Sequence, residues 1–119
     1  MKLDGEEHEY TLIAANNYAQ CLSSLERYGE AKTLLKKTIP VAQRVLEASN
    51  EYIFRMRGCY AEALYEDAGA TLDDLREAVT TFEDLARIAR RTLGGAHPLT
   101  AQIEQSLQYA REDLRLRTQ

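Results

Sequence analysis

The sequence predicts an all-α fold: a helical-hairpin solenoid with about two and a half repeats and five helices. The Glu-Tyr pair at residues 9 and 10 returns 42 residues later, at residues 51 and 52. The small residues Ala19 and Ala31 return as Ala61 and Ala78, and the segment 93–100 opens a third copy that echoes residues 5–11. A unit of this length cannot bury its apolar face alone, so the copies are expected to stack.

The first repeat is predicted to be a helix over residues 9–25, a tight turn over 26–29 and a second helix over 30–46. In the turn, Gly29 can take a positive φ and Tyr28 can fill the helix junction. The apolar stripe predicted to face the core of the first helix is Leu12, Ala15, Tyr18, Ala19 and Leu22.

Pro40 lies inside the second predicted helix, where it removes one backbone hydrogen bond. This costs about 3 kcal/mol in an isolated helix. The apolar stripe nevertheless resumes in phase at Val41, so we expect a kink and not the end of the helix.

The second repeat is predicted to contain helices over residues 51–67 and 72–93, followed by a terminal helix over 98–116. Ser49 or Asn50 is a suitable N-cap for the first of these helices. Thr71 and Asp74 form a capping-box pattern for the next. Glycines at 94 and 95 end that helix, and Pro98 suits the first turn of the terminal one.

The spacing between equivalent residues is 42 in the first half of the repeat but 47 between Ala31 and Ala78, so five residues have been inserted. The insertion falls near residues 66–74. A longer acidic loop could hold it, but we expect the helices to be extended by about a turn because Leu72 and Leu75 keep helical spacing. One domain over residues 1–119 then contains repeat one (9–47), repeat two (51–93) and the terminal helix.

Composition excludes several classes of protein. The hydrophobic share of 45% and the charged share of 29% are ordinary for a soluble globular domain. A net charge of −4 offers no basic surface for nucleic acid or for anionic membranes. Neither a membrane span nor a signal peptide is apparent, which favours a cytoplasmic protein or a fragment of a larger one. Cys21 and Cys59 are expected to be buried, reduced thiols.

The chain resembles tetratricopeptide repeats through the residues 16–19 (Asn-Asn-Tyr-Ala), the turn and helix start at 26–31, and residues 44–46. Its long period and the linker at 93–100 are similar to the kinesin light chain type of this repeat. The second repeat departs from the pattern, because Gly58 and Cys59 stand where the double Asn stood. Gln108 occupies the small-residue position of the third copy, which fits a terminal helix.

The resemblance implies that the first helix of each pair lines a concave groove that binds a peptide. Side-chain amides suit such a groove because each can donate and accept hydrogen bonds to an extended backbone. Alternatively, the side chains of Asn16 and Asn17 form hydrogen bonds with neighbouring turns, and Arg55 and Arg57 belong to a solvated face. The implied groove residues are Ile13, Asn16, Asn17, Gln20, Ser23, Arg55, Gly58, Cys59, Glu62, Tyr65, Gln102, Gln105, Tyr109 and Glu112.

The sequence favours a binding module over an enzyme. It has no glycine-rich phosphate loop, no HExxH and no nucleophile elbow, so neither catalysis nor a cofactor is expected. His8 and His97 are expected to cap helix starts and not to bind metal, because no second ligand follows at i+4. The alternative function is a self-associating scaffold, in which the terminal-helix stripe Ile103, Leu107, Ala110 and Leu114 pairs with a second copy.

Overall fold

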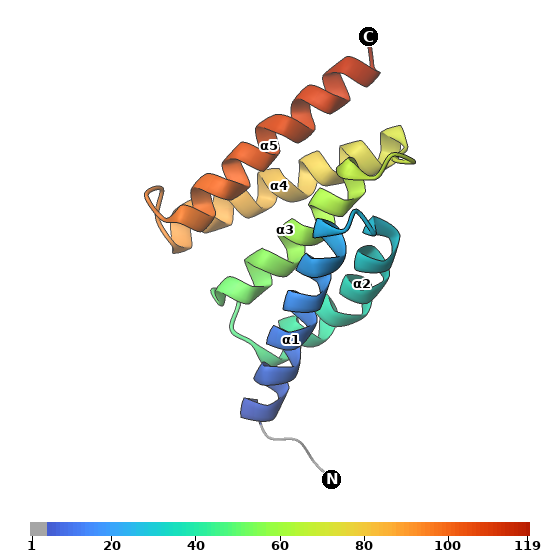
Figure 1. Ribbon diagram of the computed structural model, residues 1–119. Coiled ribbons are helices and arrows are strands. Elements are labelled where there is room, and N and C mark those ends of the chain that lie inside the picture. The colour runs from blue at the N-terminus through green and yellow to red at the C-terminus, as the bar shows by residue number, and fades with distance from the viewer. Residues whose placement is uncertain (1–4) are drawn as a thin grey trace.

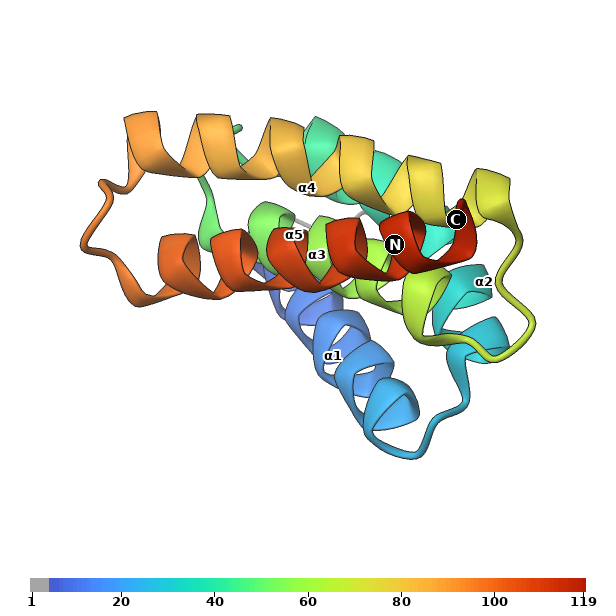
Figure 2. The same cartoon turned by 90° about the horizontal axis from the view of Figure 1, so that it is seen from above.

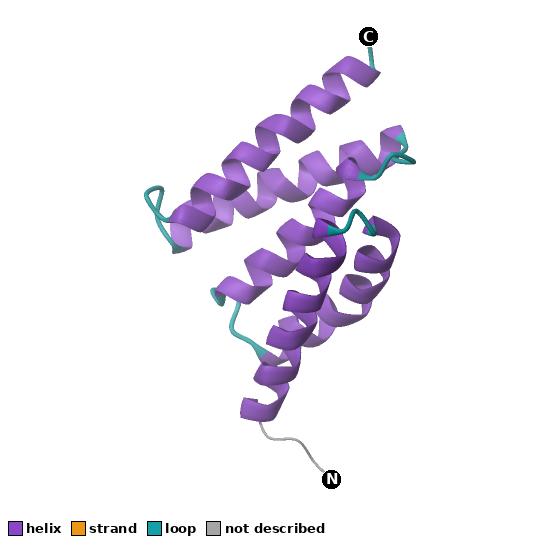
Figure 3. Cartoon of the chain, in the orientation of Figure 1, coloured by secondary structure: helices purple, strands orange, loops and turns teal. Residues whose placement is uncertain are grey.

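The computed structural model describes the backbone of residues 5–119 and the side chains from Glu9 onward. Within these residues the chain forms helices joined by loops, with no strand (Figure 3). The all-α class and the five expected helices are therefore confirmed. The helices are α1 (Gly5–Ser24), α2 (Tyr28–Val45), α3 (Glu51–Glu66), α4 (Leu72–Thr92) and α5 (Pro98–Arg117).

Consecutive helices pack against one another along the whole described chain (Figure 1). α1 also contacts α3, and α3 contacts α5, so the odd-numbered helices form a continuous layer. Seen from above, α4 and α5 lie side by side over α3, with α1 and α2 beyond it (Figure 2). The resulting body extends over 54 × 31 × 20 Å, as expected for stacked helical hairpins.

Two apolar clusters form the core, and α3 contributes to both. One cluster joins α1 and α2 to α3 residues such as Ile53, Met56 and Cys59; the other joins α4 and α5 to α3 residues such as Phe54, Ala61 and Leu64, so interleaved positions of α3 serve the two clusters. The repeated small residues Ala19, Ala31, Ala61 and Ala78 are each 0% exposed. Their small side chains leave room for neighbouring helices to approach closely, so the repeat seen in the sequence marks helix contacts.

The five inserted residues are divided between a loop and a helix. α3 ends at Glu66, where an offset of 42 from the end of α1 places it, so α3 is not extended. The α3–α4 turn covers residues 67–71, two more than the α1–α2 turn at 25–27. At an offset of 47, α4 would begin at Leu75, but it begins at Leu72, about one turn earlier. The expected extension is thus confirmed for α4 only.

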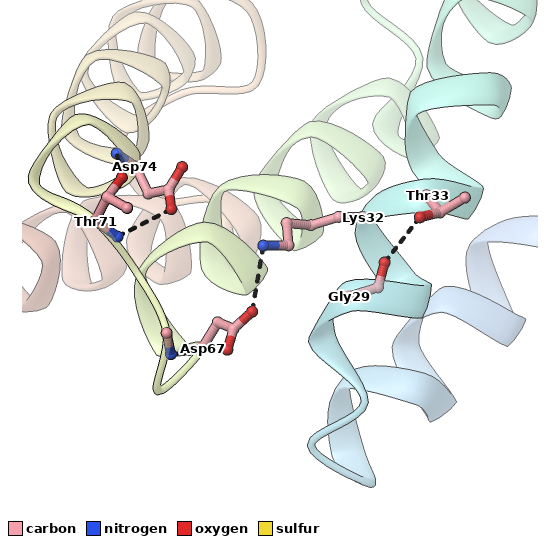
Figure 4. Close-up of polar contacts among 7 residues, drawn as sticks. Gly29, Lys32, Thr33, Asp67, Thr71 and Asp74 are labelled. Carbon is pink, nitrogen blue, oxygen red and sulfur yellow. Dashed lines mark hydrogen bonds and ion pairs between the residues drawn. The ribbon is translucent and has the colours of Figure 1, made fainter.

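The predicted caps of α3 and α4 are present. The backbone N–H of Tyr52 donates to Asn50 Oδ1 at 2.9 Å, which makes Asn50 and not Ser49 the cap of α3. At α4, Thr71 Oγ1 accepts from the Asp74 N–H at 3.1 Å, and Asp74 Oδ2 accepts from the Thr71 N–H at 3.0 Å (Figure 4). This reciprocal capping box satisfies backbone donors that the helix itself leaves free.

An ion pair fixes the longer turn against the first hairpin. Lys32 Nζ of α2 lies 3.3 Å from Asp67 Oδ2, while Asp67 Oδ1 accepts from the Gly69 N–H at 3.0 Å (Figure 4). The Gly69 hydrogen bond, followed by the Lys32 interaction, lowers the pKa of the Asp67 carboxyl.

The α1–α2 turn differs from the prediction. Glu26, and not Gly29, has the positive φ, at 59°, and Gly29 lies inside α2. The backbone N–H of Arg27 donates to the Leu22 carbonyl, and that of Glu26 donates to the Ser23 carbonyl. This pair of bonds is a Schellman motif, which requires the left-handed conformation at the first residue beyond the helix, here Glu26.

The inward face of α1 was also predicted only in part. Leu12, Ala19 and Leu22 are buried, but Tyr18 is 59% exposed. Tyr18 precedes Ala19 by one position, or about 100° around the helix, and no described element covers that side. Both cysteines are free thiols, as expected, but Cys21 is exposed and only Cys59 is buried.

α2 and α5 test two further expectations. α2 continues through Pro40 to Val45, so the proline does not end the helix.

In α5, Ile103, Leu107 and Ala110 are buried in a cluster with α4. Most of the stripe expected to pair with a second copy therefore packs against α4 within the chain, and Leu114 is partly buried there. No helix in the described residues is long and apolar enough to cross a membrane.

Candidate functional site

A pocket of about 230 Å³ opens where α1, α3 and α5 meet. Its apolar lining comes from α3, α4 and α5, and its polar lining from the three odd-numbered helices. The apolar residues are Phe54, Phe82, Leu99 and Ile103; the polar ones are Asn16, Asn17, Gln20, Arg55, Cys59, Glu62, Gln102 and Ser106, with Gly58 between them.

Helix α1 supplies three amides from one face. Asn16 and Gln20 are one turn apart, so both point to the same side, and Asn17 is adjacent. Asn17 and Gln20 are exposed, and within the described part of the chain neither makes a hydrogen bond. Their donors and acceptors are therefore available to a bound molecule.

Asn16 differs from its neighbours because it is only 3% exposed. Its Oδ1 has no hydrogen-bond partner among the described residues. A buried polar group without a partner costs about 1–3 kcal/mol. The alternative interpretation, in which the neighbouring turns satisfy this side chain, does not hold for Asn16 Oδ1.

Helix α3 contributes two charged side chains, Arg55 and Glu62, and a glycine, Gly58, to the pocket lining. Arg55 is oriented by Glu51, with Nη2 3.7 Å from the carboxylate. Burial, followed by the nearby Glu66 charge, raises the pKa of Glu62. One turn before Glu62, a Cβ added at Gly58 would meet no atom within 4 Å, so the pocket is open directly above the α3 backbone.

The thiol of Cys59 closes one side of the pocket. Cys59 Sγ lies 3.4 Å from Ser23 Oγ of α1, and both residues are buried. Burial raises the pKa of this thiol, which keeps it in the neutral form. The Ser23–Cys59 contact thus links α1 to α3.

The start of α5 is positioned by His97. Its Nδ1 accepts from the Leu99 N–H at 3.1 Å, and its Nε2 lies 2.9 Å from Glu51 Oε1 at the start of α3. The predicted cap at His97 is confirmed, whereas the side chain of His8 lies outside the described residues. Among those residues, no group of three or more metal-ligating side chains occurs.

The structure brings together only some of the predicted groove residues. Asn16, Asn17, Gln20, Arg55 and Glu62 line the pocket. Gly58, Cys59 and Gln102 also line it, whereas the other predicted residues do not, and they are Ile13, Ser23, Tyr65, Gln105, Tyr109 and Glu112.

Two of these exclusions have clear physical causes. Tyr65 is 8% exposed, and its ring packs edge-on against Phe82 with centroids 6.0 Å apart, so it belongs to the core. Gln105 Nε2 donates to the Tyr109 hydroxyl at 2.8 Å, and this pair lies on the exposed surface of α5.

Comparison with known proteins provides no relative: no family model, curated protein or solved structure matches the chain.

Proposed function

We propose that the chain is a protein–protein interaction module that binds an extended peptide or protein segment in the groove between α1, α3 and α5. In this proposal it is a tetratricopeptide-like module of the kinesin light chain type, a non-catalytic scaffold of the cytoplasm. The observation that carries the proposal is that three side-chain amides line one pocket and make no hydrogen bond within the described residues. They are Asn17, Gln20 and Gln102. An extended peptide has unpaired N–H and C=O groups along its length, and amides can bind both.

Gly58 supports the same function. A glycine inside a helix costs roughly 0.5–1 kcal/mol relative to alanine. No packing contact compensates for this cost, because the space above Gly58 is open. A backbone that must be approached closely by a ligand is one of the situations that favour glycine.

Asn16 adds a second cost that has no structural benefit within the described chain. A buried Oδ1 without a partner destabilises the folded state. Sites that bind ligands often retain such unfavourable groups because their benefit comes only in the complex.

The test begins with a displayed peptide library, from which binders to the whole chain are selected. The affinity of a selected peptide is then measured for wild type and for the double variant Asn16→Ala, Asn17→Ala. We expect affinity to fall at least tenfold while helicity and the unfolding midpoint do not fall, because the change removes an unpartnered buried oxygen and no apolar core.

A matched control is Gln108→Ala, which removes an exposed amide of α5 that does not line the pocket. This variant should bind like wild type. Equal affinity of the wild type and the double variant would refute the assignment of the groove.

A further inference from the structure

A second surface lies on α1, on a side that the other described helices leave exposed. Residues 10–25 contain no charged side chain, in a chain of which 29% is charged. Tyr10, Tyr18 and Leu25 are 66%, 59% and 65% exposed, and Ala14 and Cys21 are exposed between them. Steps of three and four residues place these five side chains on one face of the helix, which we call the α1 outer face.

The repeat provides a template for what covers such a face. At the offset of 42 that relates α1 to α3, the α1 outer face corresponds to Tyr52, Met56, Tyr60, Ala63 and Asp67. Met56 and Ala63 are 0% exposed, and the two tyrosines are partly buried.

Helix α2 is the element that packs on this α3 surface. Met56, Tyr52 and Tyr60 share one apolar cluster with Leu35, Ile39 and Ala42 of α2. The α3 residues thus meet branched and small apolar side chains of α2 and, at Asp67, the ammonium group of Lys32. Leu25 stands at the position of Asp67 in the α1 outer face, so no cation is needed there. The outer side of α2 is charged, with Lys36, Lys37 and Arg44 exposed.

We propose that the α1 outer face is a docking site for an amphipathic helix of a partner protein, with the chemistry of α2. That helix presents Leu, Ile and Ala at helical spacing toward Tyr10 and Tyr18 and keeps its charges in solvent. The absence of charge across the α1 outer face matches an uncharged, apolar inner face of the partner. This docking site is separate from the peptide groove and does not depend on the function proposed for it.

A second copy of the chain is a poorer occupant. Its α2 and α4 bury their apolar sides against α3 and α5, and elsewhere its exposed large apolar side chains are Val45, Leu72, Tyr109 and Leu116. The fullest apolar surface that a copy offers is therefore its own α1 outer face. That surface has two tyrosines, an alanine, a cysteine and a single branched aliphatic residue, Leu25. It lacks the ridge of Leu and Ile side chains that faces Tyr52 and Tyr60 in the template.

The two thiols of the protein allow a direct test. Cys21 is exposed within the α1 outer face, whereas Cys59 is buried between α1 and α3. The probe is a synthetic peptide of residues 28–46 in which Pro40 is replaced by Ala, since proline opposes an isolated helix. At a peptide concentration of about 1 mM, the reaction of Cys21 with a thiol reagent should slow at least tenfold, as a Kd of about 0.1 mM or below gives.

Matched variants define the surface. Tyr18→Lys should abolish the protection of Cys21, while Tyr109→Lys, at a tyrosine 55% exposed on α5, should leave it intact. A peptide carrying Leu35→Asp and Ile39→Asp should not protect Cys21. Protection that persists in Tyr18→Lys would overturn the proposal, as would a rise in Cys59 reactivity, which would mean that the peptide disrupts the cluster of α1, α2 and α3.

A fusion of the α2 sequence to the same chain tests the docking site without depending on the affinity of a separate peptide. Residues 9–50 are duplicated ahead of Glu9, with Cys21→Ser in the added copy, so that the added α2 sequence precedes α1 as α2 precedes α3. Protection of the remaining Cys21 by the peptide or in the fusion supports the docking site, and full reactivity in both overturns it. Protection that rises with protein concentration alone, together with the mass of two chains, would also overturn it by making a second copy the occupant.

Discussion

Glu26 illustrates how one residue can be strained by the turn that it completes. It holds φ at 59° so that the Schellman bonds at the end of α1 can form. A side chain with a Cβ is unfavourable in this conformation by about 1–2 kcal/mol. After the C-terminus of α4, the residue with positive φ is Gly94, at 93°. Glycine has no Cβ, so this cost is absent there.

We therefore expect Glu26→Gly to stabilise the protein by about 0.5–1 kcal/mol, after allowance for the greater freedom of glycine in the unfolded chain. Gly94→Ala should destabilise it by about 1 kcal/mol, since alanine is strained at a positive φ. Urea unfolding of both variants measures these changes. A loss of stability in Glu26→Gly would show that the Glu26 side chain contributes more than its backbone costs.

Glu62 gives a prediction about pH. Burial raises its pKa above the ordinary value of 4.5, so above that pH the folded state retains a proton that the unfolded chain has lost. Stability attributable to this group is therefore present at low pH and is lost as pH rises through the folded-state pKa.

The variant Glu62→Gln has no group that titrates at this position. Its unfolding free energy should fall less than that of wild type as pH rises above about 4.5 toward neutral. Glu77→Gln, at an exposed position of α4, serves as the control in urea unfolding across this pH range. Parallel pH profiles for wild type and Glu62→Gln would contradict the prediction.

Gly58 gives the last prediction at this scale. Because a Cβ at this position meets no atom within 4 Å, Gly58→Ala should stabilise α3 by about 0.5–1 kcal/mol. It should also weaken binding of a groove peptide, since the methyl group enters the pocket. Thermal unfolding and peptide titration measure the two effects, and a variant that is more stable but binds normally would separate Gly58 from the site.

At the scale of the helices, local chemistry determines where each element begins. The capping box at α4 uses both Thr71 and Asp74, and α4 begins about a turn earlier than the repeat spacing requires. The capping box therefore sets how much of the insertion becomes helix.

Removal of this cap has a defined cost. Thr71→Ala should destabilise the protein by about 1 kcal/mol, the usual value for an N-cap. Thr80→Ala, at an exposed position within the same helix, should change stability by less than about 0.5 kcal/mol. Chemical denaturation of the pair gives the comparison, and equal effects would mean that the capping bonds do not contribute.

Helix positions could be predicted from the sequence because caps, glycines and apolar spacing act locally. Asn50, Thr71 and His97 cap as their residue types suggest. The orientation of α1 could not be predicted in full, since an exposed Tyr18 and a buried Tyr65 are equally apolar in the sequence. Which tyrosine is covered depends on neighbouring helices, and α1 has a neighbour on fewer sides than α3.

The same limit applies to the pocket. The polar residues of α1 and α3 could be placed on a common surface from their helical spacing alone. Phe82 could not, because it comes from α4 and reaches the pocket only through the packing of α4 against α3. Tyr65 was expected at the surface of the groove, but its contact with Phe82 holds it in the core.

At the scale of the whole molecule, stability is divided between two clusters that share α3. In stacked repeats each unit is stabilised mainly by its immediate neighbours, so damage in one cluster should spread only weakly to the other. Leu35 is 0% exposed in the cluster of α1, α2 and α3, and Phe82 is 1% exposed in the cluster of α3, α4 and α5.

Truncation of each residue should consequently have a local effect on hydrogen exchange. Leu35→Ala should cost about 2–5 kcal/mol of packing and Phe82→Ala about 3–5 kcal/mol. In Leu35→Ala, amides of α1 and α2 should lose protection while those of α4 and α5 keep most of theirs; Phe82→Ala should give the reverse. α3 should lose protection in both variants because it packs in both clusters. Equal loss along the whole chain in either variant would instead mean that the helices unfold as one cooperative unit.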